Sequence, residues 1–118
     1  MTADVPERPL IPQPPATVAA LRQAVARITP SALPAFADQL DEAVDQARQE
    51  ADFGPVWRFT TSWSIHVQIQ RQPLVAARFR ELEILAVESE DRDQRRAAVS
   101  ELGRILDDAC EAIGLGKR

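Results

Sequence analysis

Residues 54–73, GPVWRFTTSWSIHVQIQRQP, decide the fold of this chain. Over residues 57–69 every odd position is apolar except Thr61, which is the alternation expected of a half-buried strand. The same segment also forms two apolar stripes at helical spacing, one that includes Trp63 and a second that includes Trp57. The two interpretations predict different folds, one purely helical and one with a strand.

The helical interpretation of this segment is the better supported one. No other part of the chain has a strand pattern, so a strand here would leave its backbone groups unpaired unless a second copy supplied a partner. Gly54-Pro55 is a favourable helix start, and Pro73 forces a break near Gln72. We therefore predict a central helix with neighbouring helices on both flanks.

Four further helices are predicted from apolar residues that recur every three or four positions. They are expected at residues 16–28, 32–52, 73–89 and 92–113. The core is expected to form around Trp63, Phe36, Leu40, Phe79 and Leu102. The sequence thus predicts an all-α, single-domain bundle of four to five helices over residues 16–116.

The first 15 residues differ in composition from the rest, because they hold five of the nine prolines. Such a segment is stiff and extended and cannot form a regular helix. We expect residues 1–15 to be an extended or disordered arm outside the core.

Composition indicates a cytoplasmic protein. The N-terminus lacks the basic start and apolar core of a signal peptide, and no apolar run approaches the roughly 20 residues that a membrane span needs. The single cysteine, Cys110, excludes an internal disulfide and fits a reducing compartment.

Charge is unevenly distributed along the chain, which has a net charge of −4. Residues 31–53 and 81–93 are strongly acidic, whereas residues 54–80 carry four arginines and no acid. The acidic balance argues against a nucleic-acid ligand, which requires a concentrated basic face. Charged helices of this kind predict complementary faces, within the fold or toward a protein partner.

The candidate partner-binding residues are the charged side chains of two helices together with the only histidine. They are Asp38, Asp41, Asp45, His66, Arg92, Arg95 and Arg96. The three arginines lie at a helix start, where acids are preferred, so they are expected to pair with an acidic neighbour such as the 32–52 helix or a partner. His66 has Ser62 one turn before it, which could form a Ser–His pair. Residues 53–80 contain no acid that could orient the imidazole, so we predict no catalytic residue.

Two acidic clusters with the same spacing suggest an alternative. They comprise Asp41, Glu42 and Asp45 on one helix and Asp107, Asp108 and Glu111 on another. Carboxylates on facing helices can hold Mg²⁺ against a diphosphate, as in small all-helical nucleotide pyrophosphatases. If the clusters face each other, they predict a Mg²⁺-dependent nucleotide pyrophosphohydrolase; if they are solvated surface, no metal or other cofactor is expected.

A spaced pattern of apolar residues, one tryptophan and prolines resembles a known family. The pattern consists of Asp52, Phe53, Pro55, Val56, Trp63 and Pro73. With the preceding segments PATVAALRQAV and PAFADQLDEAVDQA, it is similar to the actinobacterial proteins grouped as domain of unknown function 6247, over about residues 16–85. The resemblance implies an all-helical fold, no established activity and, since members often lie beside toxin–antitoxin-type genes, an accessory or antitoxin-like role.

These observations together predict a non-enzymatic, cytoplasmic protein-binding module, antitoxin-like or an adaptor, in a hetero-complex or a homo-oligomer. The hydrolase is the alternative. A dimeric DNA-binding regulator built from residues 57–113 is a further alternative, which requires residues 57–69 to form a strand.

Overall fold

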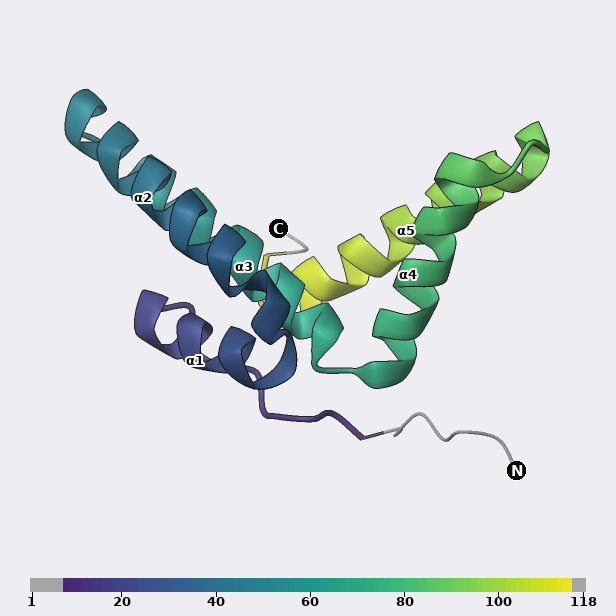
Figure 1. The fold of residues 1–118 in the computed structure, drawn as a ribbon, viewed down its shortest axis with the longest axis horizontal. Coiled ribbons are helices and arrows are strands. Elements are labelled where there is room, and N and C mark those ends of the chain that lie inside the picture. The colour runs from purple at the N-terminus through teal and green to yellow at the C-terminus, as the bar shows by residue number, and fades with distance from the viewer. Residues whose placement is uncertain (1–7, 116–118) are drawn as a thin grey trace. The chain divides into compact units, whose positions relative to one another are not determined.

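The computed structural model describes residues 8–115, which form five α-helices and no strand (Figure 1). The helices are α1 (Val18–Ile28), α2 (Leu33–Glu50), α3 (Gly54–Gln70), α4 (Pro73–Glu88) and α5 (Arg92–Ala112), and a 3₁₀ turn (Pro30–Ala32) precedes α2. The predicted all-α class is confirmed, and residues 57–69 are helical. The DNA-binding alternative required a strand there, so its premise is wrong.

The chain divides into two compact units, and the boundary falls within α3 after Val67. The N-terminal unit comprises residues 11–67, and the C-terminal unit comprises residues 68–115 with residues 8–10. The five residues expected to share one core therefore separate, with Phe79 and Leu102 in the C-terminal unit. Helical spacing identifies an apolar face but does not say which helix that face meets. The division into an arm and a single helical domain stays a prediction.

An aromatic cluster fills the core of the N-terminal unit. Phe36 on α2 is fully buried and meets the rings of Phe59 and Trp63 on α3 edge-on, with centroids 4.9 and 5.0 Å away. Aliphatic side chains from α1 and α3 complete the cluster, including Leu21, Val25 and Val67. Trp63 Nε1 donates to Gln39 Oε1 at 3.0 Å, which satisfies the indole as it enters the core.

One described residue of the proline-rich arm enters the core, contrary to the expectation that the arm lies outside it. Ile11 belongs to the buried cluster of the N-terminal unit, and Gln13 Nε2 donates to the Ser64 carbonyl at 3.2 Å. Side chains of an extended segment alternate in direction, so Ile11 and Gln13 turn inward while Pro12 stays exposed. Residues 1–7 of the predicted arm lie outside the described residues.

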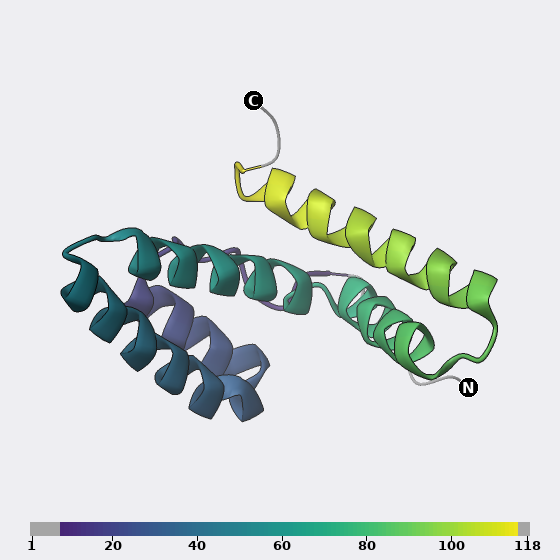
Figure 2. The same ribbon diagram turned by 90° about the horizontal axis from the view of Figure 1, so that it is seen from above.

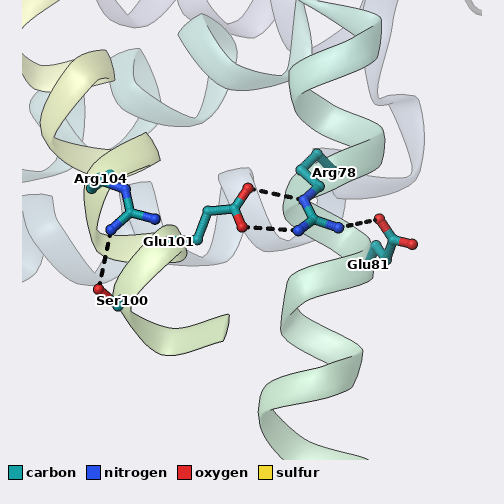
Figure 3. A network of polar contacts seen from close by, with 5 residues as sticks. All are labelled: Arg78, Glu81, Ser100, Glu101 and Arg104. Carbon is teal, nitrogen blue, oxygen red and sulfur yellow. Dashed lines mark hydrogen bonds and ion pairs between the residues drawn. The ribbon is translucent and has the colours of Figure 1, made fainter. Parts of the chain in front are cut away.

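The C-terminal unit is built on an antiparallel hairpin in which α4 and α5 lie side by side (Figure 2). Leu82 on α4 is 1% exposed, and Ala98 and Ala109 are the buried residues of α5. Arg78 donates to both carboxylate oxygens of Glu101 across the hairpin, at 2.9 and 2.8 Å, and to Glu81 one turn along α4 (Figure 3). The hairpin thus packs through small side chains and one central leucine, and an ion pair lies on its surface.

Candidate functional site

A hydrogen-bonded turn joins α2 to α3 in the N-terminal unit. Ala51 ends α2 in the left-handed conformation, with φ 52°, which lets the Asp52 N–H reach the Ala47 carbonyl at 3.1 Å. The Asp52 carboxylate then accepts from the Gly54 N–H at 3.1 Å, which satisfies a backbone donor at the start of α3. The connection is therefore short and its backbone is fixed.

Two aromatic side chains project into solvent here, one from the connection and one from the first turn of α3. Phe53 is 77% exposed and Trp57 is 56% exposed, whereas Phe36, Phe59 and Trp63 are buried. Trp57 N–H donates to the Phe53 carbonyl at 3.1 Å, so the two residues are one helical turn apart. We call Phe53 and Trp57 the aromatic tip.

The exposure of Trp57 corrects the expectation that α3 would be covered along both stripes. The stripe through Trp63 is buried, but the second stripe is covered only farther along, where Ile65 is half-buried and Ile69 buried. Periodicity shows which residues share one side of a helix and not how far a neighbouring helix extends. The aromatic tip was therefore not identified from the sequence. The one signal in the sequence was Phe53, which lies in a connection too short for its side chain to reach the core.

The solvent face of α2 is acidic. Asp38, Asp41, Glu42 and Asp45 are exposed on the side of the helix opposite Phe36, and we call these four residues the acidic face. Within residues 8–115 these four acids form one ion pair, between Asp45 Oδ1 and Arg48 Nη1, and its distance of 3.9 Å is long. The predicted acidic candidates therefore share a face whose charge is left largely uncompensated.

The predicted basic candidates lie on the first turns of α5. Arg95 Nη1 donates to the Ser89 carbonyl at 2.8 Å, while Arg92 and Arg96 are exposed. Asp91 caps the helix by accepting from the N–H groups of Asp93 and Gln94. Ion pairs between described residues join Arg48 to Asp45 and Arg78 to Glu81 and Glu101, so none of the three arginines has the acidic partner expected for it.

His66 is held inside the N-terminal unit. Its Nε2 lies 3.2 Å from Thr29 Oγ1, and its ring meets Trp63 edge-on at 4.9 Å. Ser62, one turn earlier, is exposed. Burial lowers the pKa of His66 below its ordinary value of 6.5, since the charged imidazolium loses hydration there.

We expect acidification to destabilise the protein through His66. The lowered pKa means that the unfolded chain binds a proton first, so stability is full above pH 6.5 and falls as the pH drops through 6.5 toward the folded pKa. Urea melts between about pH 7.5 and 5.5 measure this slope. The His66→Gln variant should lose this part of the pH dependence; an identical slope in both proteins would contradict the assignment.

The two acidic clusters of the hydrolase alternative belong to different units, Asp41, Glu42 and Asp45 to the N-terminal one and Asp107, Asp108 and Glu111 to the C-terminal one. Among residues 8–115, no three His, Cys, Asp or Glu side chains are placed to hold a metal ion. A cavity of about 320 Å³ in the C-terminal unit has Asp108 as the one carboxylate among its lining residues, beside Gln68 and Gln72. The structure adds no observation in favour of the hydrolase, which stays a prediction.

The fold and surface define an all-α protein with an acidic helix, an exposed aromatic turn and a helical hairpin. None of the helices in residues 8–115 is long and apolar enough to cross a membrane. Comparisons with protein-family models, with curated proteins and with solved structures found no match to this chain.

Proposed function

We propose that this chain is a non-enzymatic, cytoplasmic protein-binding module, an adaptor or antitoxin-like protein, whose partner binds the aromatic tip and the acidic face. The observation that carries the proposal is the exposure of Phe53 and Trp57 at the end of an acidic helix. The resemblance to domain of unknown function 6247 is consistent with such a role and remains part of the proposal.

Large exposed aromatics support a binding role because their burial is favourable and they lose little conformational entropy. A folded chain gains nothing by leaving Phe53 and Trp57 in water, while three other aromatic side chains fill its core. The fixed turn beneath the tip supports the same role. Ala51 and Asp52 fix the backbone before the partner binds, so less conformational entropy is lost on binding.

The charge of α2 supports one kind of partner. The acidic face favours a basic surface and disfavours an acidic one, and it speeds association at low salt. The proposed partner is therefore a protein with an apolar pocket for the tip and lysine or arginine side chains for the acids. An acidic face of this kind repels nucleic acid.

The test is a tagged pull-down from the native host with three forms of the full chain. The wild type should retain one stoichiometric partner, and Phe53→Ser/Trp57→Ser should lose it. The control variant, Leu74→Ser/Ile84→Ser, removes two exposed apolar side chains of the C-terminal unit and should keep it. Equal recovery by the tip variant and the wild type would place the binding surface elsewhere, and no partner from a folded sample would count against the module itself.

We expect each tip residue to matter in the purified complex. Truncating a buried interfacial aromatic costs about 2 kcal/mol or more, which is a loss of roughly 30-fold in affinity. Asp38→Asn/Asp41→Asn/Asp45→Asn should act differently. It should lower the association rate constant and make that rate constant less sensitive to salt concentration. Calorimetry and stopped-flow mixing separate these effects. Tip variants that bind as the wild type does would be inconsistent with the proposed site.

A further inference from the structure

The exposed side of α5 carries an apolar stripe that the hairpin leaves uncovered. Val99 is 57% exposed and Leu106 is 40% exposed, and Gly103 and the half-buried Cys110 lie on the same side at spacings of three and four. We call these four residues the α5 stripe. It is separate from Ala98 and Ala109, which are buried in the hairpin.

Gly103 is the residue of this stripe that most needs an explanation. Glycine in a helix interior is destabilising relative to alanine, and Gly103 lies in the middle of α5 with no positive φ to require it. A Cβ at this position would meet nothing within 4 Å, so packing within the described residues does not require glycine either. A helix without a side chain at its centre allows the backbone of a second helix to approach closely.

Four charged residues beside the stripe have the unfavourable sign for their place along the helix dipole. Arg92 and Arg96 lie in the first turns, where acids such as the neighbouring Asp93 are favoured, and Asp107 and Glu111 lie toward the C-terminal end, where cations are favoured. Within residues 8–115 none of these four side chains forms an ion pair. Each end of α5 therefore carries charges, unpaired within the described residues, that a binding partner could neutralise.

We propose that the α5 stripe is the interface of a homodimer, in which two copies of α5 pack antiparallel about Gly103. In this arrangement the N-terminal part of each helix lies beside the C-terminal part of the other. Arg96 is seven residues before Gly103, while Asp107 and Glu111 are four and eight residues after it, so each arginine faces the partner's acids. The two-fold axis forms this contact twice, as an isologous interface requires.

The same charges select a second copy in antiparallel orientation over other occupants. A parallel pair would place arginines against arginines and acids against acids, which is unfavourable. The antiparallel pair uses only charges that α5 already has. The dimer is independent of the proposed protein-binding site, which lies in the other unit, and would present two aromatic tips.

A charge-swap experiment on the full chain tests the dimer. Sedimentation velocity from micromolar to millimolar protein should show a monomer–dimer equilibrium for the wild type. Arg92→Glu/Arg96→Glu should raise the dissociation constant more than about tenfold, because it places like charges together, and Asp107→Arg/Glu111→Arg should do the same. Mixing these two variants should restore a dimer, since the N-terminal charges of each helix are again opposite in sign to the C-terminal charges of the other.

Two controls keep the test specific. Arg27→Glu/Arg80→Glu changes net charge equally at exposed positions outside α5 and should leave the dissociation constant unchanged. Gly103→Leu should leave the monomer folded, because its side chain enters open space, yet block dimerisation. A monomer at every concentration, a dimer insensitive to Gly103→Leu, no recovery on mixing, or a dimer dissociated by Phe53→Ser/Trp57→Ser would each overturn the proposal.

Discussion

Replacing Phe36 with alanine should destabilise the N-terminal unit by about 3–5 kcal/mol, the usual cost of deleting a buried phenylalanine. The ring is fully buried between Phe59 and Trp63, and the Arg22 guanidinium covers its face at 5.6 Å. Since α1, α2 and α3 all contribute to this cluster, no single helix can move to fill the cavity. The loss is a large fraction of the stability of a small protein.

Phe53→Ala is the matched control for this prediction. It removes the same side chain from a position that is 77% exposed, so its effect should stay within about 0.5 kcal/mol. Urea denaturation followed by circular dichroism compares the two variants. Equal destabilisation by the two substitutions would mean that Phe36 is not at the centre of the core.

The second large effect is expected from Leu82→Ala, which should lower the unfolding free energy of the C-terminal unit by about 2–5 kcal/mol. Leu82 is 1% exposed, and the buried residues of α5 are alanines that cannot expand into the space it leaves. The Arg78–Glu101 ion pair cannot compensate, because exposed ion pairs contribute little. The hairpin should therefore open.

Leu74→Ala deletes the same atoms at a position that is 50% exposed and should be much milder. Native-state hydrogen exchange locates each effect. Leu82→Ala should accelerate exchange in α4 and α5, and Phe36→Ala should accelerate it in α1, α2 and α3 as far as Val67. If either substitution accelerates hydrogen exchange in both units, the two units unfold as one.

Much of the fold could be predicted because its decisive signals are local. Gly54-Pro55 and Pro73 limit α3 to the observed Gly54–Gln70, and the other helix ends lie within two residues of their predicted positions. The division of the core could not be predicted, since Phe36 and Phe79 have equivalent patterns and only the tertiary fold decides their neighbours. Ile11 was missed because prolines exclude a helix without excluding burial.

The candidate surface was predictable only where charge and periodicity coincide. The acidic face could be inferred because Asp38, Asp41 and Asp45 lie opposite Phe36 on a clearly amphipathic helix. His66 is a candidate by residue type alone, and its contact with Thr29 is set by the tertiary fold rather than by any local pattern. The aromatic tip depends on how far neighbouring helices reach along α3, which no local pattern encodes.

The unequal settings of the two tryptophans provide two intrinsic fluorescence probes. Trp57 emits from water, while Trp63 emits from the core of the same unit. A ligand at the tip should shift the emission of Trp57 to shorter wavelength, and loss of the core should shift that of Trp63 to longer wavelength. Trp57→Phe leaves one reporter, so occupancy and unfolding can be followed separately in an unlabelled protein.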